Sequence, residues 1–581
     1  MSLDQGAVPA ARTVRRRARL VASWLITILA FLLVWFALVA PTKLDRLTFG
    51  AFLRIPIEGL IVVALGLVLP LRWRRVLAIS VGVLLGLLAI VKILDMGFYA
   101  EVDRPFDPVN DWSSFKPAIG VLRDSVGADW SNAAVVGAIL LAVATLVLLP
   151  LSVLRLTRLT AQHRVTSARA LTAVGVVWIL CAALGVEIVA GTPVASTSAA
   201  TLAYHQVREV RFELQDRRKF AVKLGAEDSV SSTPASDLLT GLRGKDVIIA
   251  FVESYGRVAV QGTKFSPQVD AVLKAGTQSL QNAGFASQSA FLDSPTYGGI
   301  SWLAHSSLQS GLWINSQSRY NELVSSNRFT LSDAFKRAGW RTVGDVPSNT
   351  GSWRQGTSFY HYDQLYNASN VGYAGPKFSY GAMPDQYILS AFQRMELGKQ
   401  NRAPVMAEID LVSSHTPWAP LPHMVPWDKV GDGSIFDSMP AQGQQPDQVW
   451  QQSSQVQAAY GQSVQYSLSA LFSWVQQVHD NNLVMIVVGD HQPAHIVSGY
   501  RASHYVPISI IAHDPKVMGR ISSWGWQAGM LPSAQAPVWG MNAFRNRFLG
   551  AYGSPPTAPA APPEPSHPPV GRAQPQLAAP H

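Results

Sequence analysis

Two apolar segments of the chain end in side chains that commonly bind metal ions. Glu253 follows the segment IIAFV, and Asp490 and His491 follow MIVVG. If both segments are strands of one parallel sheet, their carboxyl ends lie at the edge where ligands bind in α/β folds. Two carboxylates and an imidazole then supply three of the four ligands of a divalent cation. Taken alone, Glu253 is typical of a helix cap or a surface position, so the prediction depends on both segments together.

A candidate nucleophile lies in the segment SPTYGGISWLAHSSLQSG, residues 294–311. Here Gly, Ser and Thr separate a strand-like segment, FASQSAFL, from a helix-like segment, WLAHSSLQ. Ser301 is expected in the first helical turn, where free backbone amides and the helix dipole favour an oxyanion. A cation beside its hydroxyl would make it a competent nucleophile. The alternative is that Ser301 only caps the helix, a common role for Ser.

The strands that must position these residues are apolar and rich in β-branched side chains. Helical segments separate them, and the strands are predicted at 246–252, 405–412, 483–489 and 507–513. Strands buried on both faces and alternating with helices indicate an α/β domain with a mostly parallel sheet. We predict that this domain occupies residues 244–550.

The first third of the chain is far more apolar. The whole chain is 48% hydrophobic and only 14% charged, whereas ordinary soluble domains have roughly 25% charged residues. About 20 apolar residues cross a bilayer, and apolar segments lie at about 20–40, 57–71, 76–94, 133–154 and 170–190. We therefore predict a five-helix transmembrane domain over residues 1–190, in which the second helix is the weakest because Pro56, Glu58 and Pro70 crowd it.

Basic residues determine the predicted orientation of these helices. The segments 1–19, 72–75 and 155–169 contain twelve arginines and one acid, whereas 96–132 contains six acids and three bases. The positive-inside rule places the arginine-rich segments in the cytoplasm. Five crossings then carry everything after about residue 190 out of the cytoplasm. The net charge of +10 is largely a topology signal, so nucleic-acid binding is not predicted.

Two further segments flank the α/β domain. Residues 191–243 form a polar juxtamembrane linker, in which HQVREVRFELQDRRKF fits an amphipathic helix at the membrane surface and a solvated linker helix equally well. Residues 551–581 are rich in Pro and Ala and are predicted to be disordered. The single cysteine, Cys181, excludes an intrachain disulfide framework and a Cys-based zinc ribbon.

The order and spacing of the motifs resemble the alkaline phosphatase/sulfatase superfamily over about residues 244–515. The resemblance is carried by the run from FSPQVDAV to LQSG, by DAFKRAGWRTV and by VGDHQ. In the first of these, Ser301 lies ten residues before Gly311, as the superfamily's nucleophile does. Sulfatases that convert their nucleophile to formylglycine need Pro and Arg two and four residues later. Leu303 and His305 occupy those positions, so this maturation is not expected.

A five-helix anchor and a single carboxylate at residue 253 are similar to lipoteichoic acid synthases and lipid A phosphoethanolamine transferases. The resemblance implies one divalent cation, Mn²⁺ or Zn²⁺, whose ligands are Glu253, Ser301, Asp490 and His491. Metal sites of this composition do not decide between the two ions. Thr296 is a second candidate nucleophile because those transferases use Thr, whereas Ser301 has the better spacing.

The same resemblance implies residues that contact the substrate. Trp353 and Arg354 match a Trp-Arg pair that holds a phosphoglycerol group in the synthases. His415 matches the substrate-side histidine that both groups of transferases place after a strand, and His504 matches a histidine that the phosphoethanolamine transferases use on the phosphate side. Val343 stands where the synthases have a His, so recognition of a glycerol hydroxyl is not implied.

The sequence thus predicts a metal-dependent, sulfatase-like enzyme of a bacterial cell membrane, with its catalytic domain outside the cytoplasm. Its expected reaction transfers a substituted phosphoryl head group from a phospholipid donor to an envelope polymer or glycan through a covalent Ser or Thr intermediate. Tethering to the lipid bilayer would favour encounter with the donor. The alternatives are a hydrolase of sulfuric or phosphoric esters of envelope polymers and a non-catalytic envelope protein with the same fold.

Overall fold

The computed structural model describes residues 8–189, 192–378 and 380–554. The chain forms two compact units, one comprising residues up to 109 together with 129–216, and the other comprising 110–128 together with residues from 217 onward. We call them the helical unit and the sheet unit. Most of the tail predicted at 551–581 lies outside the described residues, which end at residue 554.

Long apolar helices build the helical unit. Its helices are α1 (Val8–Val39), α2 (Ile57–Val68), α3 (Leu71–Val102), α5 (Ala128–Gln162), α6 (Arg164–Leu184) and the first part of α7 (Ser198–Gly225). Among the described residues, four segments are long and apolar enough to cross a membrane, namely 16–39, 71–102, 128–162 and 164–184. The described chain therefore carries several helices of membrane-spanning length, whereas the count of five remains a prediction. With 12 residues, α2 is only about 18 Å long, less than the hydrocarbon thickness of roughly 30 Å.

Polar side chains tie the helices together at one end of the unit. Lys92 of α3 donates hydrogen bonds to the carbonyls of Ala37 and Leu38 at 2.9 and 3.0 Å. Arg54 donates to the carbonyl of Val39 at 3.0 Å. The last carbonyls of a helix have no partner within the helix, so these cations satisfy the end of α1.

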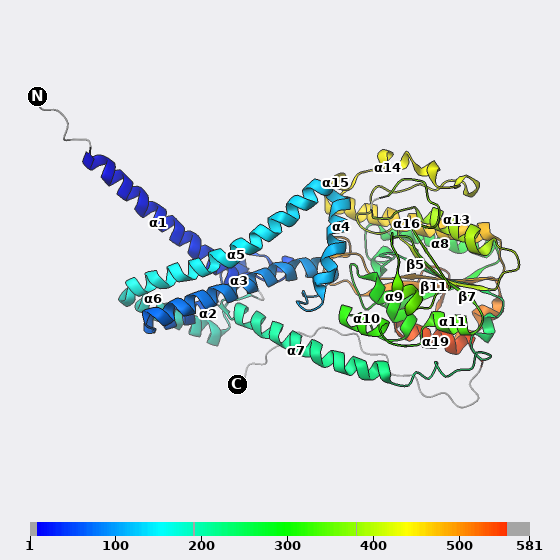
Figure 1. Ribbon diagram of the computed structural model, residues 1–581, viewed down its shortest axis with the longest axis horizontal. Helices are drawn as coiled ribbons and strands as arrows, with labels where there is room; N and C mark the ends of the chain where they lie inside the picture. Colours follow the sequence, from blue (N-terminus) through cyan, green and yellow to red (C-terminus); the bar gives the residue numbers. More distant parts are fainter. Residues whose placement is uncertain (1–7, 190–191, 379, 555–581) are drawn as a thin grey trace, which may run out of the picture. The chain divides into compact units, whose positions relative to one another are not determined.

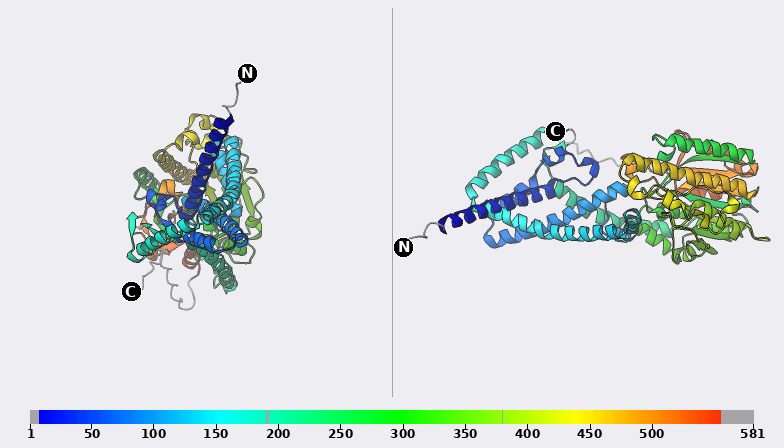
Figure 2. Two further views of the ribbon diagram at one scale, coloured as in Figure 1. Left: turned by 90° about the vertical axis from the view of Figure 1, so that its left-hand side faces the viewer. Right: turned by 90° about the horizontal axis from the view of Figure 1, so that it is seen from above.

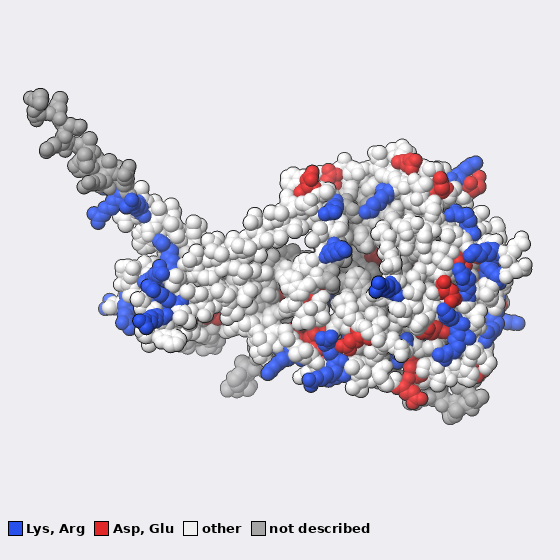
Figure 3. Space-filling model, viewed as in Figure 1, with Lys and Arg blue, Asp and Glu red and all other residues white. Residues whose placement is uncertain are grey.

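The opposite end of the helices carries the arginines. Arg155 of α5 donates to the Ser23 carbonyl of α1 at 2.6 Å. α3 contacts α1, and its Gly82 lies against Pro150 of α5; Figure 2 shows these helices from two further sides. Figure 3 shows basic side chains gathered at this end. Most of the segment 155–169, predicted as a loop, is helical, because only His163 separates α5 from α6. At its other end α6 stops at Leu184, six residues before the predicted limit, because Gly185 adopts a left-handed conformation with φ 61° that commonly ends helices.

A nine-stranded sheet forms the centre of the sheet unit, with the strand order β12-β6-β11-β10-β5-β9-β7-β8 and β13 paired to β6. The strands β10, β5, β9, β7 and β8 are parallel, whereas β11 is antiparallel to both of its neighbours. The predicted α/β class with a mostly parallel sheet is thus confirmed. Its strands are β5 (Asp246–Val252), β6 (Ala286–Asp293), β7 (Arg341–Val346), β8 (Gln364–Asn367), β9 (Val405–Leu411), β10 (Leu483–Gly489), β11 (Tyr505–Ala512), β12 (Gln527–Ala528) and β13 (Val538–Gly540).

Helices cover both faces of this sheet (Figure 1). One apolar core packs beneath α8 (Ser266–Asn282), α13 (Asp385–Phe392) and α16 (Ser453–Val478). The other packs beneath α9 (Ser301–Ser310), α10 (Gln317–Val324), α11 (Leu331–Arg337) and α19 (Ala543–Tyr552). Because every residue of β5 and β10 is buried, these strands read as continuous apolar runs rather than alternating ones. Shorter helices of this unit are α4 (Phe115–Val126), α12 (Arg354–Ser358), α14 (Met439–Gln442), α15 (Pro446–Val449), α17 (His495–Ser498) and α18 (Pro515–Gly519).

Candidate metal centre and nucleophile

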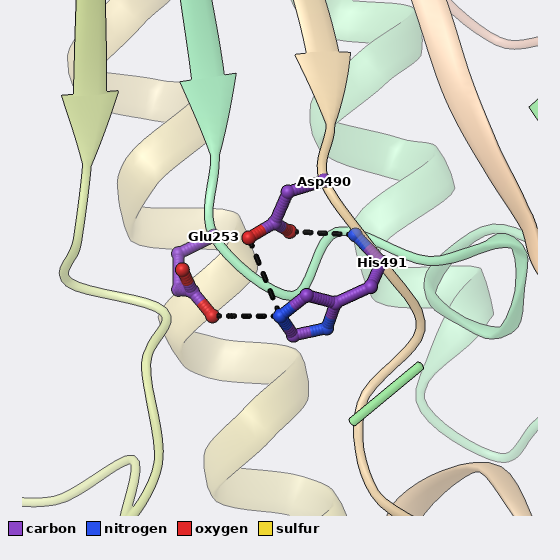
Figure 4. A group of neighbouring side chains, drawn as sticks. All are labelled: Glu253, Asp490 and His491. Atoms are coloured by element: carbon purple, nitrogen blue, oxygen red, sulfur yellow. Dashed lines mark hydrogen bonds and ion pairs between the residues drawn. The ribbon is translucent and has the colours of Figure 1, made fainter. Parts of the chain in front are cut away.

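Neighbouring strands bring the predicted ligands together. β5 and β10 are parallel partners whose register pairs Val252 with Gly489, so Glu253 and Asp490 leave the sheet at the same level. Figure 4 shows Glu253, Asp490 and His491 pointing toward one another below the strand ends. Their ligand atoms all lie within 4.8 Å of one another. The carboxyl ends of β5 and β10 therefore bring two carboxylates and one imidazole close enough together to act as ligands of one divalent cation.

Asp490 is held by backbone amides on one side only. Its Oδ1 accepts hydrogen bonds from the amides of Ser254 and His491, both at 2.7 Å. Its Oδ2 is buried, accepts no hydrogen bond from any described residue and lies 3.4 Å from His491 Nε2. A buried carboxylate oxygen without a donor is costly, and a cation is the partner that this geometry lacks.

His491 is oriented by its other ring nitrogen. Nδ1 lies 2.8 Å from the carbonyl of Gln492, so a proton on Nδ1 leaves the lone pair of Nε2 facing Glu253 Oε1 at 3.3 Å. Metal-binding histidines are commonly held in this way by a carbonyl behind them. Nitrogen and oxygen donors of this kind suit Zn²⁺ or Mn²⁺, so the residues present fit one divalent cation.

The charges of the group also favour a cation. Burial opposes ionisation of Glu253, but the hydrogen bond and charge of His491 lower its pKa overall. Burial raises the pKa of Asp490, and the adjacent charge of Glu253 raises it further. Two buried carboxylates this close ionise together only beside a positive charge, which either a protonated His491 or a divalent cation supplies.

The hydroxyl of Ser301 lies at this group, and that of Thr296 does not. Ser301 Oγ is 3.1 Å from Glu253 Oε2 and 3.2 Å from His491 Nε2. Thr296 is buried, and its Oγ1 donates to the carbonyl of Gly299 at 2.6 Å. Of the two candidate nucleophiles, only Ser301 contacts the metal-type residues.

A strained turn sets the direction of Ser301. Gly298 and Gly299 have φ values of 68° and 157°, and Ile300, the residue before α9, has φ 64°. A β-branched residue in the left-handed region is unusual and costs about 1–3 kcal/mol. Ser301 is the first residue of α9, so the helix begins directly at the hydroxyl that faces Glu253.

Each of the two predicted substrate histidines packs against a tyrosine ring. His415 stacks on Tyr380, with ring centroids 3.6 Å apart and planes 11° apart, and its charge contributes to the lowered pKa of Glu253. The ring of His504 lies 5.2 Å from that of Tyr297, and its backbone carbonyl accepts from the Ser294 amide at 3.0 Å.

Trp353 and Arg354 lie outside the hydrogen-bonded group. The Trp353 ring packs against those of Tyr360 and Tyr362, with centroids 5.3 and 6.3 Å away. Arg354 is exposed and begins α12. Within the described residues, no hydrogen bond or ion pair joins either side chain to Glu253.

A second group of side chains beside the first was not predicted. His305 Nδ1 lies 2.9 Å from Glu408 Oε1 and 3.6 Å from Asp410 Oδ1. Burial lowers the pKa of His305, but the charge of Asp410 and the hydrogen bond with Glu408 outweigh it and raise the pKa to about 9. The signal was present in the sequence as two carboxylates, two residues apart, inside an otherwise apolar strand.

The site thus consists of a metal-type group at the ends of parallel strands in an α/β domain, with the hydroxyl of Ser301 from α9 against it. No protein-family model and no curated protein matches the chain. Solved structures do match, among them a protein in the alkaline phosphatase superfamily from Vibrio parahaemolyticus, at 16% identity over 55% of this chain and 69% of that one, with a TM-score of 0.35.

Two of the other matches are integral-membrane or envelope enzymes by name. One is the integral membrane protein lipooligosaccharide phosphoethanolamine transferase A from Neisseria meningitidis, at 12% identity over 90% of this chain and 94% of that one, with a TM-score of 0.44. Another is the lipoteichoic acid synthase LtaP from Listeria monocytogenes, at 14% identity over 58% and 78%, with a TM-score of 0.36. One of the three is described as a member of the alkaline phosphatase superfamily, and at these identities and TM-scores none of them assigns a function to this chain.

Proposed function

We propose that the chain is a membrane-anchored, metal-dependent phosphotransferase in which Ser301 is the nucleophile. Its reaction transfers a substituted phosphoryl head group from a phospholipid to an envelope polymer or glycan. The observation that carries the proposal is the position of Ser301 Oγ, within 3.2 Å of both Glu253 Oε2 and His491 Nε2. A serine that only caps a helix has no need of a buried carboxylate and an imidazole at its hydroxyl.

The covalent step follows from these contacts. Ser301 Oγ attacks phosphorus and forms the Oγ–P bond as the bond from phosphorus to the diacylglycerol oxygen breaks. The attacking hydroxyl loses one proton and the departing diacylglycerol oxygen takes up one proton, so no net proton is gained or lost in this step. A divalent cation held by Glu253, Asp490, His491 and Ser301 would supply charge that lowers the pKa of the hydroxyl and stabilises the phosphoryl oxygens. An acceptor hydroxyl then displaces the serine from phosphorus.

The residues around the hydroxyl have proposed roles on the substrate. His415, which lies close enough to influence the pKa of Glu253, and His504 would stabilise the equatorial phosphoryl oxygens. Trp353 and Arg354 would contact the head group, for which the motif resemblance is the support. Arg354 is exposed and so remains available for an anionic ligand.

We propose five membrane crossings, which place the sheet unit outside the cytoplasm. α2 starts directly after Pro56, where β1 (Ile55–Pro56) pairs with β4 (Ala195–Ser196). Near the other end of α2, Gly66 lies against Thr157 of α5, between two arginines of the basic end. Although α2 is short, the chain therefore passes from one end of the helical unit to the other along α2 and the extended residues beside it. This supports counting α2 as a membrane span.

Mass spectrometry of the purified full-length protein tests the nucleophile. After incubation with a head-group-labelled phospholipid and Zn²⁺ or Mn²⁺, the peptide containing Ser301 should gain the mass of the phosphorylated head group. Ser301→Ala should abolish both the adduct and turnover, whereas the matched control Thr296→Val should retain both. An active Ser301→Ala and an inactive Thr296→Val would refute the assignment. Release of free head group without any acceptor would identify a hydrolase.

A further inference from the structure

One face of α9 carries three polar side chains at a spacing of four residues. Ser301, His305 and Gln309 occupy positions i, i+4 and i+8, which lie on the same side of a helix. Ser301 faces Glu253, while the next two reach one carboxylate of β9. His305 Nδ1 lies 2.9 Å from Glu408 Oε1, and Gln309 Nε2 donates to Glu408 Oε2. The two turns behind Ser301 are therefore bonded to the central sheet.

Glu408 is a buried and fully partnered carboxylate. It is 6% exposed, and its Oε2 also accepts from the hydroxyl of Tyr362 at 3.1 Å. Gln309 is anchored from the other side as well, because its Oε1 accepts from the amide of Ser332 at 3.0 Å. Removing the charge of Glu408 would therefore leave several buried donors poorly matched.

His305 also ties α9 to the strand that ends in Glu253. Its ring stacks on Phe251 of β5, with centroids 3.7 Å apart and planes 15° apart. Phe251 lies two residues before Glu253, on a strand whose register pairs it with Asp410 of β9. One imidazole thus contacts both strands that flank the approach to Ser301.

We propose that His305, Gln309 and Glu408 form a positioning clamp that holds the rotation of α9 and so aims Ser301 Oγ at Glu253 and His491. This inference rests on the proposed function, in which Ser301 is the nucleophile. A rotation of about 20° moves an atom some 3 Å from the helix axis by roughly 1 Å. Misplacement of a reacting group by that amount can cost about 100-fold in rate.

A second cation is the competing use of these residues, because ligand atoms of His305, Glu408 and Asp410 lie within 4.8 Å of one another. Hydrogen bonding favours the clamp. Asp490 Oδ2 in the first group accepts no hydrogen bond from a described residue, whereas both oxygens of Glu408 have protein partners. A cation at Glu408 would have to displace bonds that the chain already makes.

A double-mutant cycle in Zn²⁺ affinity tests the clamp without requiring turnover. The purified full-length protein and the variants Glu408→Gln, Ser301→Ala and the double variant are titrated with Zn²⁺. If Glu408 acts by aiming Ser301, each single change lowers the affinity by about 10-fold, and the double variant loses no more than the larger single loss. In turnover assays, Glu408→Gln should lower kcat by about 100-fold with little change in KM.

Glu396→Gln is the matched control for loss of a buried carboxylate. Glu396 is 0% exposed and accepts from Arg341 and Tyr366 at 2.8 and 2.6 Å, and among the described residues its partners lie outside α9. Its substitution should leave Zn²⁺ affinity unchanged. If Glu408→Gln does not fold, Gln309→Met removes one arm of the clamp and must show the same non-additivity with Ser301→Ala.

Two outcomes overturn the clamp. Additive losses would mean that Glu408 acts on the cation independently of Ser301. Two Zn²⁺ ions per wild-type chain and one per Glu408→Gln chain would assign the group to a second cation. The same experiments distinguish the clamp from the proposed function. Non-additive losses of Zn²⁺ affinity without any phosphoryl transfer would refute the transferase and keep the clamp. Phosphoryl transfer with additive losses of Zn²⁺ affinity would refute the clamp and keep the transferase.

Discussion

Replacing Asp490 by Asn should stabilise the metal-free protein and abolish its response to zinc. The ligand atoms of Glu253, Asp490 and His491 lie within 4.8 Å of one another. Two negative charges at that separation repel by roughly 3 kcal/mol at an effective dielectric constant of about 20. The imidazole of His491 offsets part of this repulsion, so we expect a net gain of about 1–2 kcal/mol in the free energy of unfolding.

Asn preserves the local backbone contacts while removing the charge. Its Oδ1 can still accept from the amides of Ser254 and His491, which now bond to Asp490 at 2.7 Å. Its Nδ2 replaces the oxygen that has no hydrogen-bond donor, and an amide nitrogen does not bind a cation. If about 12 kcal/mol of zinc binding divides over four ligands, losing one costs roughly 3 kcal/mol, or more than 100-fold in affinity.

Thermal unfolding of the chelator-treated protein at pH 8, with and without added Zn²⁺, checks both the predicted stabilisation and the predicted loss of the zinc response. Metal-free Asp490→Asn should melt a few degrees above the metal-free parent, and zinc should raise the melting temperature of the parent alone. Asp345→Asn is the control, because Asp345 Oδ2 is also buried without a hydrogen-bond partner among the described residues but lies outside the metal-type group. A metal-free Asp490→Asn that melts below the parent, yet still responds to zinc, would refute the reasoning.

Three further outcomes are expected. Gly311→Ala should destabilise the protein by about 2–3 kcal/mol in chemical unfolding, because the φ of Gly311 is 71° and a Cβ there would lie 2.6 Å from Arg545 Nε. The control Gly339→Ala, at a residue with φ 97° and open space around it, should lower the free energy of unfolding by only about 1 kcal/mol. Folding raises the pKa of His305 from 6.5 to about 9, so its contribution to the stability of the folded protein is complete below pH 6.5 and is lost as the pH rises through 9. The melting temperature should therefore fall over this pH range, and His305→Gln should flatten that fall. Arg354→Ala should raise KM for the phospholipid and leave Zn²⁺ affinity unchanged in titrations, since no described bond joins it to the metal-type residues.

The ends of the strands that carry Glu253 and Asp490 were predictable from local pattern. Strands expected at 246–252 and 483–489 are present with those bounds, because buried parallel strands need continuous apolar residues and the first polar residue marks their end. Parallel neighbours then bring Glu253 and Asp490 to one level without further information. The helical segments of the first third were likewise predictable from length and apolarity, although not their ends.

The sequence alone left the choice between Ser301 and Thr296 open. Both hydroxyls lie in the same Gly-rich segment, and their directions depend on the backbone angles of Gly298, Gly299 and Ile300. Composition shows that such a turn is present, but not which side chain it turns toward the sheet edge. The contact of Ser301 with Glu253 is a property of the folded turn.

Local pattern thus determined which residues end the strands, where the apolar helices lie and which side chains are available for chemistry, because these depend on neighbours within a few positions. Tertiary structure alone decided that His305 meets Glu408, which lies 103 residues away, and that Trp353 packs among tyrosines. Such contacts depend on how strands from distant parts of the chain are ordered in the sheet, and the local pattern of apolar and polar residues does not determine that order.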